Sequence, residues 1–569
     1  MKEIIGKKLR TLLTGAAVSA AAALLCTLPA GAQFMNDPGD VNCDGATDYL
    51  DVDAMISMIN KERELSKQGK LNADITGDGL VTYEDLDLLI SIINGEYVPK
   101  KTEEIALPTD ESQVVNETPA TYSSLGVSRD DKDAFEEKIK SETKLPAINI
   151  TTKDNSELIL SRDIYTSCVV DVFNAGEKFE LDEVSAGIRV RGNSSAFYGD
   201  VEKIKQNTVP YRIKFDKKTN MLGLNDGAKC KSWVLLKSDW DLVRNDIALR
   251  FGRTIFGDDA YCSDAKLVDL YVNDKLQGVY LLCEQNQVNK NRVNVSEPEE
   301  NYTGKDFGFY LELDNYAWED PDNQYVNMRY GGAYCTDITG VRRKFESAAY
   351  SIKNDIYTQA QKDFISKYLN NIFSIVYRAC ERGEYYTFDK NYDLVKADFT
   401  SAEETLAAVM DLDSAVDMYL LYEIVHDYDC GEGSFYLCVD FDKDSKINKL
   451  QFTSPWDFNW AYNDSTERYW AGAFCEQSFA DSFGDRSNPW FIVLAKQDWF
   501  RQRASEKWQA LNGQGAIRAC IDEEKAILET YREDLNRPAD GAVDAAYSLL
   551  DGWLTQRLDW MDRTFKSEQ

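Results

Sequence analysis

The sequence contains a single histidine, His426, among 569 residues. Any mechanism that needs a serine–histidine pair, two histidines or a histidine-rich zinc site is therefore nearly excluded. Positive charge is also scarce, because 64 Lys and Arg stand against 97 Asp and Glu, a formal net charge of −33. Such a field repels nucleic acid and anionic membranes, so neither is an expected partner, and it suits the binding of cations.

The cysteine pattern and the hydrophobic pattern each exclude a class of protein. Twelve cysteines are present, but no C-x-x-C pair occurs and their spacing is irregular. This disfavours a cysteine metal site or a disulfide scaffold, so we expect mainly buried thiols with an occasional bridge. The one long apolar run, Leu12–Leu28, follows a basic start and precedes the small residues Ala30-Gly31-Ala32. It predicts a signal peptide over residues 1–32 and a secreted protein without a membrane span.

The length is too great for one ordinary domain, and 43% hydrophobic residues with 12% aromatics can build a large core. We expect a small domain at residues 36–98, a polar linker at 99–144 and a large domain at 145–565. The large domain is predicted to be α+β. Short alternating strands fill its first half, whereas the second half is mainly helical and is interrupted by a hairpin at residues 434–452.

Two segments that lie 34 residues apart repeat one pattern of oxygen-bearing side chains. Oxygen ligands fall at loop positions 1, 3, 5, 9 and 12, with glycine at position 6, which is the spacing of a calcium-binding loop. Each loop runs into an amphipathic helix, so we expect two Ca²⁺ ions rather than two acidic turns without metal. The expected ligands are Asp40, Asn42, Asp44, Asp48 and Asp51 in the first loop and Asp74, Thr76, Asp78, Thr82 and Asp85 in the second.

These loops and their exit helices resemble the type I dockerin family over residues 36–98, a small all-α domain. The resemblance implies a cohesin module of a scaffold protein as partner. It also implies attachment to a cell-surface or cellulosome-type assembly outside the cell. Loop positions 10 and 11 carry recognition in that family, and here they are Tyr49-Leu50 and Tyr83-Glu84. Because the two pairs differ, we do not expect the two loops to dock equivalently.

Two predicted strands of the large domain, residues 187–191 and 211–215, carry cations on one face. The first strand is followed by Gly192, Asn193, Ser194 and Ser195, a turn whose backbone amides suit an anion. Paired cationic strands beside such a turn are suited to a phosphate, and the alternative is a solvated strand face. The cationic residues are Arg189, Arg191, Arg212 and Lys214.

A third segment arranges acidic residues around the hairpin. The predicted helix Leu412–Val425 leads to Asp429, Ser434 lies five residues later, and the hairpin ends before Asp457. Protein kinases use this order of parts: a catalytic aspartate, a metal-binding residue five positions on, a hairpin, and Asp-Phe-Gly with the aspartate on Mg²⁺. The alternative makes both aspartates turn or cap residues.

Together, in this order, the three segments resemble the spore-coat CotH kinase-like family, an atypical secreted branch of the protein kinases, over residues 145–565. The resemblance implies an atypical protein-kinase-like fold and transfer of phosphate from ATP to protein hydroxyls, with Mg²⁺ or Mn²⁺. Matched by position, the resemblance implies ATP-phosphate contacts for Lys214, the catalytic base for Asp429 and metal ligation for Asp457 and Ser434. It also implies nucleotide contacts for the turn Gly192, Asn193, Ser194 and Ser195, and for Glu284. Further shared motifs are Trp233-Val-Leu-Leu, Asp241-x-x-Arg244-Asn245, Leu270-Tyr-Val-Asn273 and Asn488-Pro489-Trp490-Phe491.

Some positions depart from the kinase pattern. Ser434 stands where kinases have Asn, and Asn459 stands where relatives usually have Asp. No G-x-G-x-x-G occurs, and Asp246 is the only candidate helix acid to pair with Lys214. Two other hypotheses therefore stay open: a catalytically weak or inactive binding module of the same assembly, and a carbohydrate-active enzyme of polysaccharide degradation. The sequence does not identify the phosphorylated protein.

Overall fold

The computed structural model of the chain divides into two compact units, residues 1–103 and 104–569, which we describe separately. The structure describes residues 38–42, 46–60, 65, 67–76, 81–95, 97, 115–129, 131–197, 200–238, 242–317, 324–330, 333–337, 340–345, 347–427, 429–462, 475, 480–481, 484–485, 488–537 and 539–566. The expected signal peptide and the expected ligands Asp44 and Asp78 lie outside the described residues.

The small unit contains the helices α2 (Tyr49–Ile59), α3 (Lys67–Ala73) and α4 (Tyr83–Ile93). α2 and α4 are the exit helices expected after the two acidic loops, and each begins at a capping box. Their apolar faces meet in one cluster, in which Met55 and Leu89 are fully buried. The helical spacing of the apolar residues in each helix therefore creates the core of this unit.

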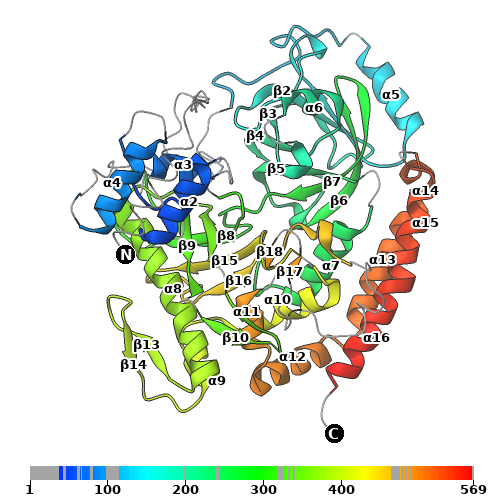
Figure 1. Cartoon of the computed structure of the whole chain (residues 1–569). Coiled ribbons are helices and arrows are strands. Elements are labelled where there is room, and N and C mark those ends of the chain that lie inside the picture. Colours follow the sequence, from blue (N-terminus) through cyan, green and yellow to red (C-terminus); the bar gives the residue numbers. More distant parts are fainter. Residues whose placement is uncertain are drawn as a thin grey trace. The chain divides into compact units, whose positions relative to one another are not determined.

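Seven strands of the large unit form a closed barrel (Figure 1). The barrel order is β1-β2-β3-β4-β5-β7-β6, and only the closing pair, β1 with β6, is parallel. Alternate side chains point inward, so Ile188, Ile213 and Trp233 pack in the interior. The strands are β1 (Ala147–Thr151), β2 (Thr166–Phe173), β3 (Leu181–Val190), β4 (Tyr211–Thr219), β5 (Cys230–Lys237), β6 (Ala265–Val272) and β7 (Lys275–Glu284).

The chain from residue 115 onward packs on this barrel, which corrects the expected linker at 99–144. Tyr122 donates a hydrogen bond to the buried carboxylate of Asp171, and Arg129 pairs with Asp274 at 2.6 Å. The helix α5 (Lys132–Glu142) follows and buries Ile139 against the barrel. The polar composition of this segment belongs to its exposed face, while a few buried side chains attach it to the barrel.

A second, five-stranded antiparallel sheet follows the barrel in the chain, with the order β16-β15-β8-β12-β9. The expected hairpin at 434–452 is the β15–β16 edge of this sheet, and the other three strands were not predicted. The strands are β8 (Gly308–Leu313), β9 (Gln324–Met328), β12 (Ala348–Ile352), β15 (Phe435–Asp440) and β16 (Gln451–Thr453). Short pairs join β10 (Tyr334–Thr336) to β11 (Arg342–Lys344), β13 (Tyr386–Phe388) to β14 (Leu394–Lys396), and β17 (Ala480–Asp481) to β18 (Gly484–Asp485).

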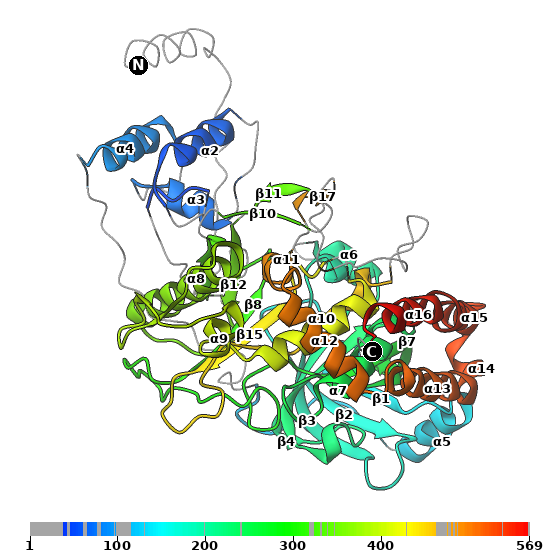
Figure 2. The same cartoon turned by 90° about the horizontal axis from the view of Figure 1, so that it is seen from below.

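Helices surround the sheet and one side of the barrel (Figures 1 and 2). α7 packs Ile247 and Phe251 into the main core together with Leu281 of the barrel. α10 is buried along almost its whole length, and α16 lies against it. The helices are α6 (Val201–Gln206), α7 (Arg244–Phe256), α8 (Gln359–Arg382), α9 (Ala402–Ala407), α10 (Leu412–Val425), α11 (Pro489–Leu494), α12 (Asp498–Ala510), α13 (Gly515–Thr530), α14 (Arg532–Leu535), α15 (Ala542–Tyr547) and α16 (Leu554–Thr564).

Two further expectations concern helices and cysteines. Across the described ranges, no helix combines the length and the apolar character that crossing a bilayer requires. The ten cysteines within those ranges are free thiols, and nine of them are buried. The structure thus places these cysteines as small apolar core residues.

Candidate functional site

The two acidic loops of the small unit share one hydrogen-bond pattern. In the first loop, the position-12 carboxylate of Asp51 accepts from the backbone N–H of Asn42 at 2.9 Å and of Asp48 at 2.8 Å. Asp85 accepts from positions 3 and 9 of the second loop at 2.9 and 2.8 Å. Both carboxylates are fully buried. Each loop is thereby tied to the first turn of its exit helix, as the closed shape of a Ca²⁺ loop requires.

The first loop is also held from outside by α3. The side-chain amide of Asn72 donates to the backbone oxygen of Asp40 at 2.7 Å, and Gly39 donates its N–H to the backbone oxygen of Asn72 at 2.9 Å. Both Asn72 and Asp40 are buried. Asn72 was not assigned from the sequence, because it lies outside the repeat and its position in α3 carries no periodic signal.

The cationic strands of the large unit lie side by side. In the antiparallel β3–β4 register, Arg189 faces Arg212, and Gly187 faces Lys214. The intervening residues point into the barrel interior, so the cations share its outer face. The register therefore confirms the prediction that these cationic side chains share one face of the strand pair.

Lys214 is buried on that outer face, with an exposed fraction of 1%. Its ammonium nitrogen lies 6.0 Å from the centre of the Tyr165 ring. The residue opposite it, Gly187, has no room for a Cβ, because that atom would collide with Val115 and approach Tyr165. Val115 and Tyr165 thus cover this part of the strand pair, and Val115 belongs to the segment that the sequence assigns to a linker.

The turn after β3 has the conformation that an anion-binding turn needs. Gly192 has φ +92°, a left-handed value that favours glycine, and Asn193 precedes a short 3₁₀ turn. Ser194 and Ser195 are exposed. The side-chain oxygen of Asn193 is buried and has no hydrogen-bond partner among the described residues. An amide oxygen accepts hydrogen bonds, so its missing partner is a donor or a cation, whereas the exposed hydroxyls can donate to an anion.

The Asp457 turn follows β16 and is held by α7. Phe458 donates its backbone N–H to the side-chain oxygen of Asn245 at 2.8 Å, and the Asn245 amide donates to the side-chain oxygen of Asn459 at 2.8 Å. Arg244 donates to the backbone oxygen of Ala461. The shared motif Arg244-Asn245 therefore fixes the turn that carries Asp457.

The strand turn and the Asp457 turn belong to one site. The Arg191 guanidinium lies 5.8 Å from the centre of the Trp456 ring, next to Asp457 in the chain. Burial raises the pKa of the Asp457 carboxyl, the Arg191 charge opposes that shift, and the Glu312 charge adds to it. The cation that follows β3 and the Glu312 carboxylate of β8 thus both act on Asp457.

A search of curated proteins finds no match. Comparison with protein-family models matches residues 188–561 to the family described as CotH kinase protein and residues 38–94 to the dockerin type I domain. The chain belongs to the CotH kinase family. It carries a type I dockerin domain before the CotH domain, and type I dockerin domains bind calcium.

Glu312 of the CotH domain was missed by sequence reasoning. It lies on β8 opposite Tyr436, whose hydroxyl donates to it at 2.5 Å, and it pairs with Lys353 at 2.7 Å. Burial, reinforced by Glu312, raises the pKa of neighbouring Asp314 to about 6. The sequence does hold one signal for Glu312, because it is the only acid in the otherwise apolar segment Gly308–Leu313. A charged residue among buried strand positions usually has a partner, so it marks a candidate site residue.

The predicted catalytic aspartate lies in the loop between α10 and β15. Glu432 and Gly433 donate their N–H groups to the backbone oxygen of Asp429. The Asp429 N–H donates to the carboxylate of Asp427, and the Asp429 side chain is half-buried. Ser434 follows with φ 55°, immediately before β15.

Asp427, not assigned from the sequence, is buried. Burial raises the pKa of Tyr422, and the carboxylates of Asp427 and Asp457 both add to that shift. The loop between α10 and β15 thus brings Asp427 near the Tyr422 ring, on which the charge of Asp457 also acts.

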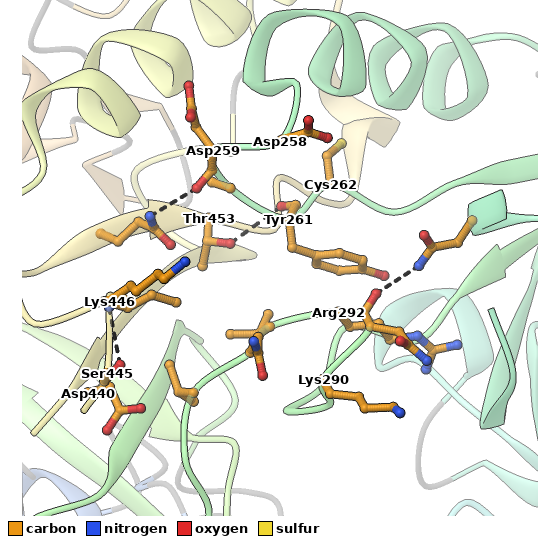
Figure 3. Close-up of a pocket in the computed structure, with 18 of the residues that line it drawn as sticks. Asp258, Asp259, Tyr261, Cys262, Lys290, Arg292, Asp440, Ser445, Lys446 and Thr453 are labelled. Atoms are coloured by element: carbon orange, nitrogen blue, oxygen red, sulfur yellow. Dashed lines mark hydrogen bonds between the residues drawn. The ribbon is translucent and has the colours of Figure 1, made fainter. Parts of the chain in front are cut away.

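Two predicted positions take other partners. Glu284, expected near the nucleotide, forms a buried ion pair with Arg292 at 3.1 Å and lines a separate pocket (Figure 3). Asp246, the candidate partner of Lys214, lies 3.7 Å from Arg250, which also contacts Glu524 at 3.3 Å.

The residues present fit an ATP–metal group in kind. Asp457 is a carboxylate with the hard oxygens that Mg²⁺ and Mn²⁺ prefer. Ser434, immediately before β15, carries a hydroxyl that could be a further oxygen ligand. Arg191 and the Gly192–Ser195 turn supply positive charge and polar groups for phosphates. The buried Nε–H of Arg191 has no acceptor among the described residues, and a phosphate oxygen is an acceptor that can complete it, which makes this fit more than a list of suitable residue types.

Proposed function

We propose that this CotH protein is a secreted kinase that transfers phosphate from ATP to protein hydroxyls while docked on a scaffold. The convergence of the β3 turn and the Asp457 turn carries the proposal, because it joins a cationic phosphate-binding element to a metal-binding carboxylate. When bound, ATP and its metal supply the phosphoryl group and the charge neutralisation for its transfer.

In this proposal each residue has one task. Lys214 and the turn formed by Gly192, Asn193, Ser194 and Ser195 hold the nucleotide phosphates, and Asp457 with Ser434 holds Mg²⁺ or Mn²⁺. Asp429 accepts the proton of the acceptor hydroxyl at its carboxylate and orients that hydroxyl. Because Asp429 lies in a half-exposed loop, a protein segment can reach it from solvent.

The dockerin domain provides the attachment. We propose that residues 36–98 form an all-α domain that binds two Ca²⁺ ions and docks on a cohesin module of an extracellular, cellulosome-type scaffold. Residues 1–32 act as the signal peptide that exports the chain. The exposed side chains of Tyr49, Leu50 and Tyr83, at 57%, 60% and 46%, support a role for this face in docking.

Three variants of the full chain test the catalytic assignment, with ATP binding and transfer from radiolabelled ATP measured separately. Asp457→Ala should abolish metal-dependent nucleotide binding. Asp429→Ala should bind ATP normally and lose transfer by about 10²–10⁴-fold, since general-base catalysis contributes that much. Lys214→Ala should weaken both.

The matched control is Asp522→Ala, which removes an exposed carboxylate from α13 and should change neither quantity. Wild-type protein that neither binds ATP with Mg²⁺ or Mn²⁺ nor transfers phosphate would contradict the kinase proposal. Transfer at the wild-type rate by Asp429→Ala would contradict only the assignment of the base.

One observation favours a second candidate, a binding module without catalysis. Lys214 is buried with its ammonium nitrogen 6.0 Å from the centre of the Tyr165 ring, so a phosphate reaches it only if its surroundings move. Ser434 and Asn459 replace the usual metal ligands, which also favours a module without catalysis. Under this alternative the intact protein docks on its scaffold yet binds no nucleotide.

A further inference from the structure

A cavity of the CotH domain lies outside the residues proposed for phosphoryl transfer, apart from Glu284. It has a volume of about 940 Å³ and is lined by four segments: residues 225–226 between β4 and β5, residues 257–264 after α7, residues 284–296 after β7, and the β15–β16 loop (Figure 3). A cavity of this size suits a ligand larger than a single ion.

Four exposed carboxylates, Asp226, Asp258, Asp259 and Asp444, line this cavity, and we call them its mouth. Two other acids of the lining are paired, Glu284 with Arg292 at 3.1 Å and Asp264 with Arg253 at 3.1 Å. Apart from these pairs, six carboxylates line the cavity, and against them stand only two lysines, Lys290 and Lys446. The structure gives none of these eight residues an ion pair within the described ranges. The six carboxylates are Asp226, Asp258, Asp259, Asp440, Asp442 and Asp444.

Two buried polar atoms of the lining have no partner. One Nη of Arg292 donates to no acceptor among the described residues, although the side chain is fully buried. The hydroxyl of Tyr261, another lining residue, is buried and has no hydrogen-bond partner within the described part of the chain. Unmade hydrogen bonds of buried groups are costly, so a ligand that supplies an acceptor to Arg292 and a partner to Tyr261 is favoured here.

We propose that this cavity binds a lysine- or arginine-rich segment of a partner protein. Cationic side chains pair with the carboxylates of the mouth, and a backbone carbonyl of the segment accepts from Arg292. A peptide offers both features in one chain, whereas a bare cation offers nothing to the Arg292 donor. This inference goes beyond the proposed kinase function and does not depend on it.

The test is binding of a fluorescein-labelled oligolysine peptide to the full chain, without nucleotide, by fluorescence anisotropy. The triple variant Asp258→Asn, Asp259→Asn, Asp444→Asn should weaken binding about tenfold, because each exposed ion pair contributes modestly and three are removed. Tyr261→Phe should also weaken binding while leaving thermal stability intact, since the lost hydroxyl has no protein partner.

The matched control removes the same charge from exposed sites elsewhere, with Asp133→Asn, Glu137→Gln and Asp522→Asn. It should bind the peptide like the wild type. If the control weakens binding as much as the mouth variant, the general field of the protein attracts the peptide and the cavity does not. Wild-type affinity in the mouth variant, or an unchanged affinity in Tyr261→Phe, would likewise overturn the proposal.

Discussion

The ion pair between Arg557 of α16 and Glu423 of α10 should be the most sensitive contact of the large unit. Both side chains are fully buried. Arg557 donates through Nε to the backbone oxygen of Glu423 and through Nη2 to its carboxylate, each at 2.6 Å. The guanidinium also lies 4.0 Å from the centre of the Trp560 ring. Burial lowers the pKa of Arg557 to about 10, against the opposing pull of Glu423.

Arg557→Met keeps most of the side-chain volume but leaves the Glu423 carboxylate buried without its cation. Breaking a buried pair from one side costs about 3–5 kcal/mol, because the remaining charge is uncompensated. The double variant with Glu423→Gln should recover much of this loss, since no charge is then stranded. The difference between the single and double variants measures the coupling.

The assay is urea unfolding followed by tryptophan fluorescence. All 11 tryptophans follow residue 104 in the chain, so the signal reports the large unit alone. The matched control is Arg518→Met, which breaks a half-exposed pair with Asp559 at 3.2 Å and should cost less than about 1 kcal/mol. A loss below that value for Arg557→Met, or equal losses in single and double variants, would refute the reasoning.

Three further predictions concern calcium, pH and docking. Chelator should reduce the helical circular-dichroism signal of the full chain, and Asp51→Ala should halve that calcium-dependent change, because metal binding stabilises the loops; an unchanged signal would contradict calcium-coupled folding. Burial raises the pKa of Asp417 to about 7, so its stabilising contribution is complete below about pH 4 and lost as pH rises to 7. Relative to Asp417→Asn, the wild type should therefore lose up to about 4 kcal/mol over that range, and parallel pH profiles in thermal melts would contradict this. Tyr49→Ala and Tyr83→Ala should weaken cohesin pull-down unequally, and small equal effects would place the contact elsewhere.

Much of the fold follows from local patterns in the sequence. The helix Leu412–Val425 has the predicted bounds, because its apolar residues and its flanking residues are unambiguous. The strand β8 was missed, since a short apolar run fits a buried helix segment as well as a strand. Its pairing with β15 depends on residues far apart in the chain, which periodicity cannot reveal.

The site was predictable in its residue types but not in its environment. Asp457 and the β3 turn were identified from motif order, whereas Glu312 and Asp427 came into view only through the sheet and the α10 loop. The burial of Lys214 could not be foreseen either. Its ammonium group lies against Tyr165, and Gly187, which pairs with Lys214, is covered by Val115 from a segment whose composition indicates a linker.

The departure at Asn459 takes a different meaning once its contacts are known. Asn245 accepts from the N–H of Phe458 and donates to the side-chain oxygen of Asn459, so residue 459 closes a clasp around the Asp457 turn. A carboxylate at 459 could accept the same hydrogen bond, but it would add a negative charge near Asp457. Burial and Glu312 already raise the pKa of Asp457, and Arg191 is the cation that opposes them. Asparagine therefore keeps the clasp while sparing Asp457 a further repulsion, which favours the ionised carboxylate that the proposed metal-binding role of Asp457 needs.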